Sequence, residues 1–126
     1  MIISEFKKIL FSSFVGTNWK ITEFWEPKVT PNFYAAKLEN GDSSVVILCS
    51  DEGDWALADG YEPSRSDLKF VDQAFVAEKL RETYGVLVMD AGTLDSPFKN
   101  SSRLCQYDVK HWKPRTVGES LFNWWD

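Results

Sequence analysis

Cysteine and histidine, the residues that bind zinc and carry out redox chemistry, are scarce in this chain of 126 residues, which contains two cysteines and one histidine. Cys49 and Cys105 do not form a Cys-x-x-Cys pair, and His111 has no second ligand at a zinc spacing. The seven glycines are scattered and form no phosphate-binding loop. No apolar run approaches the roughly 20 residues that a membrane-spanning helix needs. We therefore expect no metal, no cofactor and no membrane segment.

Aromatic residues are abundant, by contrast, with nine Phe, six Trp and four Tyr, and 44% of the residues are hydrophobic. This content can offset the entropy of ordering the chain, so a folded core is expected. The length and the lack of linkers or repeats predict one domain over residues 1–126. The formal net charge of −5 has the wrong sign for a general nucleic-acid binder.

Three segments have helical patterns and N-terminal capping residues. The first two are expected to begin at Ser4 and Asp72 and to end before Gly16 and Gly85. The third follows Thr116-Val-Gly-Glu119, which has the form of a capping box. The predicted helices are Ser4–Val15, Asp72–Tyr84 and Ser120–Asp126.

Strand-like segments alternate with turn residues along the same chain. Asn40-Gly41 predicts a hairpin with a type I′ turn, and the apolar run after it predicts a central strand buried on both faces. The predicted strands are Asn18–Glu26, Phe33–Leu38, Val45–Cys49, Trp55–Ala58, Val86–Met89 and Arg103–Lys110. The pattern indicates an α+β fold: a central, mostly antiparallel sheet, two main helices packed on it, and a short C-terminal helix.

No catalytic motif stands out. His111 lies between Lys110 and Trp112 with no nucleophile or orienting carboxylate at a recognisable spacing. The chain also lacks a Gly-x-Ser-x-Gly elbow and a His-Glu-x-x-His segment. We expect a protein that is not an enzyme, and a small enzyme of unknown type remains an alternative.

Acidic residues are concentrated in the middle of the chain. No positive residue occurs between Lys37 and Arg65, and seven acids fall in that interval. Two aromatic residues, of the kind that anchor protein interfaces, lie among these acids. The window predicts a docking face for a basic protein, and the alternative is that the charges only solvate two loops. The predicted partner-binding residues are Asp51, Glu52, Asp54, Trp55, Asp59, Tyr61 and Glu62.

The C-terminal segment combines tryptophan with positive charge. Trp112, Trp124 and Trp125 are accompanied by Lys110, Lys113 and Arg115. Tryptophan rings stacked on bases beside cations are typical of single-strand recognition. A small single-stranded nucleic-acid-binding protein is therefore a second hypothesis.

The last fourteen residues, Lys113-Pro-Arg-Thr-Val-Gly-Glu-Ser-Leu-Phe-Asn-Trp-Trp-Asp126, resemble the C-terminal signature of certain small bacterial proteins. Among these we place immunity proteins of polymorphic toxin and contact-dependent growth inhibition systems. The resemblance implies a cytoplasmic protein that is not an enzyme and that binds and blocks a cognate toxin domain, commonly a basic nuclease. It supplies no binding residues.

The N-terminus points to the same compartment, because its charges follow the apolar residues, unlike those of a secretory signal. Two reduced thiols are the simplest expectation there, with a long-range disulfide left open. The oligomeric state is left open as well.

Overall fold

The sheet is built from strands that are consecutive in the sequence. The computed structural model describes residues 1–28, 30–65, 67–99 and 106–125, and in these residues four antiparallel strands lie side by side in chain order. The strands are β1 (Lys20–Trp25), β2 (Phe33–Asn40), β3 (Ser43–Ser50) and β4 (Trp55–Ala58). The predicted α+β class with an antiparallel central sheet is confirmed.

The hairpin between β2 and β3 forms where it was predicted, but its turn is of a different type. Asn40 pairs with Ser43, so Gly41 and Asp42 are the two central residues. Gly41 has a φ of 61°, and neither Asn40 nor Asp42 has a positive φ. A positive φ at the first central position alone is typical of a type II′ turn, so the type I′ prediction is wrong.

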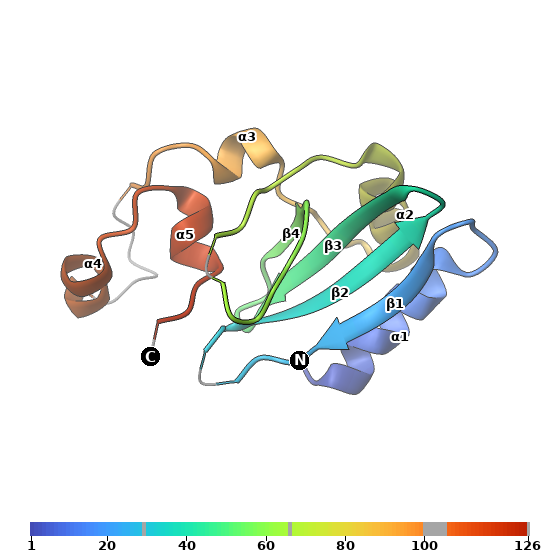
Figure 1. Cartoon of the computed structure of the whole chain (residues 1–126), viewed down its shortest axis with the longest axis horizontal. Coiled ribbons are helices and arrows are strands. Elements are labelled where there is room, and N and C mark those ends of the chain that lie inside the picture. Colours follow the sequence, from blue (N-terminus) through green and yellow to red (C-terminus); the bar gives the residue numbers. More distant parts are fainter. Residues whose placement is uncertain (29, 66, 100–105, 126) are drawn as a thin grey trace.

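Both faces of the sheet are buried, which explains the continuous apolar run of β3. Val45, Ile47 and Cys49 belong to one buried cluster with residues of helices α1 (Ile3–Phe14) and α2 (Ala74–Tyr84), and we call this side the α1 face. Val46 and Leu48 belong to a second core with Phe70, Leu94 and Phe122, on the side that we call the α5 face. Figure 1 shows α1 and α2 on the right of the view, and α4 (Gln106–Trp112) and α5 (Val117–Leu121) on the left.

The starts of both main helices differ from the prediction. Helix α1 begins at Ile3, and its N-cap is Ile2 without a side-chain hydrogen bond, so Ser4 is not the cap. Helix α2 is capped by the Gln73 side chain, which accepts hydrogen bonds from the backbone N–H groups of Phe75 and Val76. Asp72 instead accepts a hydrogen bond from the backbone N–H of Ala91, 2.9 Å away, and fixes the segment before helix α3 (Ala91–Leu94).

Two predicted strands are absent from the described structure. Val86–Met89 is a half-exposed extended segment joined to β4 by one bridge, between Val88 and Trp55, and Leu87 is 76% exposed. The segment 106–110 belongs to helix α4, and the helical i,i+4 spacing lets Tyr107 and His111 stack with ring centroids 5.4 Å apart. The start of that predicted strand, including Cys105, lies outside the described residues.

The C-terminal helix is earlier and shorter than predicted. Helix α5 spans Val117–Leu121, and Trp124 and Trp125 follow it in a non-helical segment. The predicted capping box is confirmed: the Thr116 hydroxyl accepts from the Glu119 N–H at 3.2 Å, and the Glu119 carboxylate accepts from the Thr116 N–H at 3.1 Å. No helix in the described part of the chain is long and apolar enough to cross a membrane.

Replacing Thr116 with Ala should lower the free energy of unfolding by about 0.5–2 kcal/mol, because the Glu119 N–H loses its acceptor at the start of α5. Chemical denaturation at pH 7 measures this change. Thr116→Ser keeps the hydroxyl and should retain most of the stability. Equal losses for the two substitutions would show that the capping hydrogen bond is unimportant.

Candidate protein-docking surface

The seven predicted partner-binding residues fall into two groups, one at each end of β4, with Trp55 buried between them. Asp51, Glu52 and Asp54 lie in the turn before β4, whereas Asp59, Tyr61 and Glu62 lie in the loop after it. β4 separates the two groups, and Trp55 is buried within the strand. The structure therefore offers two separate candidate surfaces.

Gly53 and Ser50 shape the turn that carries the first group. Gly53 has a φ of 92°, a left-handed conformation that glycine adopts readily. The Ser50 hydroxyl accepts from the Asp54 N–H at 2.9 Å and donates to the Asp54 carboxylate at 3.1 Å. These hydrogen bonds hold Asp54 half-buried against the turn while Asp51 and Glu52 are exposed to solvent.

Two further carboxylates contribute to the negative charge near this turn. Burial raises the pKa of Tyr34, and the charges of Glu26, Glu5 and Asp51 raise it further. Glu5 comes from α1 and Glu26 follows β1. We use the name acidic end for Glu5, Glu26, Asp51, Glu52 and Asp54. Sequence reasoning missed Glu5 and Glu26 because both lie far outside the acidic window.

The negative charges of the acidic end raise the pKa values of neighbouring groups. Burial and then the charge of Asp54 raise the pKa of the free Cys49 thiol to about 12, while the N-terminal amine acts in the opposite direction. Burial raises the pKa of Asp51, and the charge of Glu52 raises it as well. Neighbouring negative charges disfavour the ionised form of a carboxyl group, so the carboxylates at this end of the sheet repel one another.

Asp51→Asn should therefore stabilise the protein slightly at pH 7. The pKa of this carboxyl group is higher in the folded than in the unfolded state, so its ionisation destabilises the fold. The destabilisation begins as the pH rises above 3.8, the ordinary pKa, and is complete once the pH exceeds the raised pKa. We expect an increase in Tm of about 1–2 °C at pH 7, the size typical of a surface change, and none at pH 3. Calorimetry at both pH values tests this, and a lower Tm at pH 7 would contradict it.

Trp55 cannot be the exposed anchor that its position in the acidic window predicted. Its side chain is 7% exposed and stacks on Phe6, with ring centroids 5.8 Å apart. The carboxylates before Trp55 in the sequence suggested an exposed position. The side chains of β4 alternate between the two faces of the sheet, however, and Trp55 lies on the buried α1 face. Its role is to hold the turn against the core.

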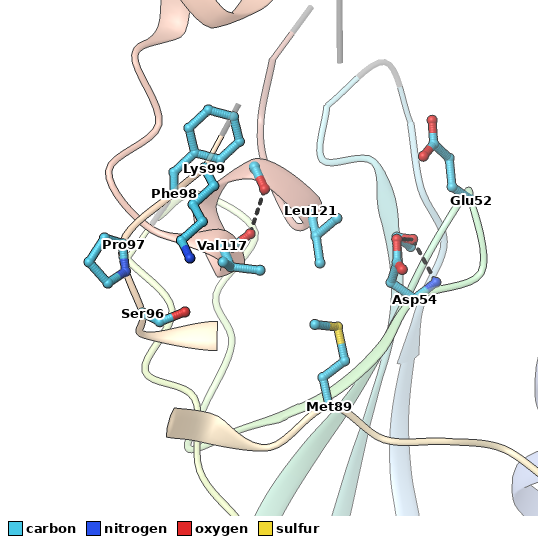
Figure 2. A pocket seen from close by; sticks show the side chains of 11 residues that line it. Glu52, Asp54, Met89, Ser96, Pro97, Phe98, Lys99, Val117 and Leu121 are labelled. Carbon is cyan, nitrogen blue, oxygen red and sulfur yellow. Dashed lines mark hydrogen bonds between the residues drawn. The ribbon is translucent and has the colours of Figure 1, made fainter. Parts of the chain in front are cut away.

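A cavity of about 370 Å³ adjoins the acidic end on the side of α5. Figure 2 shows Glu52 and Asp54 on one side of it, Lys99 on the opposite side, and Met89 and Leu121 between them. Two acidic residues thus lie across the cavity from Lys99, and the apolar side chains of Met89 and Leu121 line the space between them. The cavity combines few polar groups with an apolar lining, as binding pockets do.

The second group of predicted residues lines a larger groove on the open part of the α5 face. The groove measures about 730 Å³. Tyr61 reaches across the sheet here, because its ring lies 5.4 Å from that of Phe33 and 5.0 Å from that of Trp25. We call this cavity the sheet groove, and its charged and aromatic lining residues are Glu23, Trp25, Lys37, Asp59, Tyr61, Glu62, Arg65, Asp67 and Lys69.

The tryptophans of the C-terminal segment contact rings of the chain itself. Trp125 stacks on Trp112 with planes 5° apart, and the ring of Trp124 lies 5.3 Å from that of Phe33. His111 packs between Tyr107 and Trp112 in α4 and lines neither the cavity nor the sheet groove.

No cluster of three or more potential metal ligands occurs in the described ranges. Comparison with known proteins places the chain in no class: no protein family, curated protein or solved structure matches it.

Proposed function

We propose that this protein is an inhibitor without enzymatic activity that binds a basic bacterial toxin domain, such as a nuclease, and blocks its active site. The acidic end is the primary contact surface in this proposal. One observation carries it: in addition to burial, the carboxylates of the β3–β4 turn raise the pKa values of Cys49 and Asp51. The pKa of Tyr34 is raised by burial and by Glu26, Glu5 and Asp51, which come from three different elements. A cationic partner would relieve that repulsion.

The size of the molecule is compatible with such a role. A standard protein interface covers about 800 Å² of each partner, about a ninth of the 7448 Å² surface of this protein. Charge complementarity would accelerate encounter with the toxin and suppress binding to acidic proteins. The likeness of the last fourteen residues to immunity proteins supports the same function and implies a cytoplasmic location.

The partner for testing the acidic end is the toxin that this proposal places directly upstream of the gene, because immunity genes normally follow their toxin genes. We expect Asp51→Lys with Glu52→Lys to lower the association rate about ten- to a hundredfold at low salt and to abolish protection of cells expressing the toxin. The substituted side chains are exposed, so the Tm should change little. Surface plasmon resonance over a range of salt concentrations gives the rates.

The matched control is Asp42→Lys with Glu82→Lys, which changes the net charge equally at the exposed β2–β3 turn and on α2. This control should bind and protect like the unmodified protein. Equal effects of the two double variants would show that net charge, and not the acidic end, governs binding. A toxin domain that does not bind the unmodified protein would refute the proposed function.

A further inference from the structure

Two aromatic rings form a corner in the sheet groove. The rings of Trp25 and Tyr61 lie with their centroids 5.0 Å apart and their planes at 82°. Both side chains are partly exposed and line the groove. Phe33 packs on Tyr61 at 5.4 Å, so the corner is held in place by the second core. The faces of aromatic rings carry negative electrostatic potential, which attracts cations.

The charged residues that line the groove around this corner also favour binding of a cation. Lys37 pairs with Glu39 at 3.3 Å and Arg65 pairs with Asp67 at 2.7 Å, so two cations of the groove already have carboxylate partners. Glu23, Asp59 and Glu62 form no ion pair with any described residue. Glu23 nevertheless lies opposite Lys37 on the neighbouring strand, and the Asp59 backbone N–H donates to the carbonyl oxygen of Lys69, the remaining cation of the lining. Among the described residues, the lining of the groove therefore holds four carboxylates and three cations, an excess of one negative charge.

We propose that the corner of the sheet groove binds the guanidinium group of an arginine side chain presented by the basic partner. This inference rests on the proposed function and adds a specific contact to it. A planar guanidinium can stack on one ring while its N–H groups reach carboxylates at the rim, an arrangement that a lysine ammonium does not match. At about 730 Å³ the groove is large enough for the side chain and its backbone.

A nucleobase could also stack on Trp25 or Tyr61. The carboxylates of the lining outnumber its cations, so the groove as a whole does not favour a phosphate group. The charges of the groove therefore favour a cationic side chain over a nucleotide.

The site can be tested without the toxin. We would titrate the ¹⁵N-labelled protein with N-acetyl-arginine amide and, as an uncharged isostere, with N-acetyl-citrulline amide. Saturable shifts at the amides of Trp25, Tyr61 and Glu62 are expected with the arginine probe, and affinity about tenfold lower with the citrulline probe, because a charged hydrogen bond is lost. Equal affinity for both probes, or no saturable shift, would overturn the inference.

Glu23→Gln with Glu62→Gln removes two charges from the groove while keeping the side-chain shapes. It should weaken binding of the arginine probe about tenfold, whereas Asp51→Asn with Glu52→Gln at the acidic end should leave it unchanged. The inference would be overturned if the arginine probe shifted mainly the amide signals of the acidic end and if Asp51→Asn with Glu52→Gln abolished those shifts. Toxin binding that is insensitive to the groove variant would also refute it while the proposed function stands. If the protein binds the arginine probe but does not bind the toxin, the proposed function is refuted and the guanidinium site stands.

Discussion

Replacement of Phe6 with Ala should lower the free energy of unfolding by about 3–5 kcal/mol, the cost typical of removing a buried aromatic side chain. Phe6 is fully buried in α1 and contacts three rings of the sheet, those of Phe24, Tyr34 and Trp55, with centroids 5.3–6.1 Å away. Small domains have only about 5–15 kcal/mol of stability in total, so this one change removes a large part of it.

Urea denaturation followed by tryptophan fluorescence measures the loss. Phe11→Ala on the same helix is the matched control, because Phe11 is 56% exposed and touches Phe24 at the surface. We expect that control to cost less than about 1 kcal/mol. Similar losses for the two variants would show that the rings around Phe6 do not form the tightly packed centre of the core.

The same cluster connects the core with the acidic end. Trp55 follows Asp54 directly, and Tyr34 donates a hydrogen bond of 2.7 Å from its hydroxyl to the Met1 carbonyl oxygen, near the start of α1. The position of the β3–β4 turn therefore depends on the packing of Phe6. A milder substitution, Phe6→Leu, should keep the fold but loosen the turn, so binding studies of the acidic end need Phe6 intact.

The strands of the sheet could be predicted because their side chains alternate or are continuously apolar between clear turn signals. Val45–Cys49, for example, is apolar on both faces and lies centrally in the sheet. The prediction failed where apolar residues follow a helix: Val86–Met89 looks like a strand, but it forms only a single bridge with β4. It also failed for 106–110, where alternation and helical spacing are both present in a short segment.

The candidate site was only partly predictable from the sequence. The acidic window identified the β3–β4 turn, since turn residues are normally exposed. It could not reveal that Glu5 and Glu26 act on Tyr34 together with Asp51 of that turn, because this arrangement is created by the packing of α1 on the sheet and by the order of the strands. Nor could it show that Tyr61 folds back across the sheet to meet Trp25.

Gly118 lies in α5 where the helix packs closely on the second core. A Cβ atom at this position would be closer than van der Waals contact to Phe70 Cε2, 2.8 Å from Phe70 Cζ and 3.1 Å from the Leu94 carbonyl oxygen. Phe70 is 8% exposed, pairs through its backbone with Ala58 and contacts the Phe122 ring, so it has little room to move. An added methyl group must therefore displace the helix or the ring.

We expect Gly118→Ala to lower the free energy of unfolding by about 1–3 kcal/mol, the range typical of an overfilled core. Gly60→Ala is the control, since a methyl group there would meet nothing within 4 Å and the φ of Gly60 is not in the left-handed range; it should be neutral or slightly stabilising. Both are measured by urea denaturation, and equal stability would contradict the close packing. Because Val117, Ser120 and Leu121 line the cavity beside the acidic end, a displaced α5 should also change its shape, which amide shifts of Met89 and Ser50 would report.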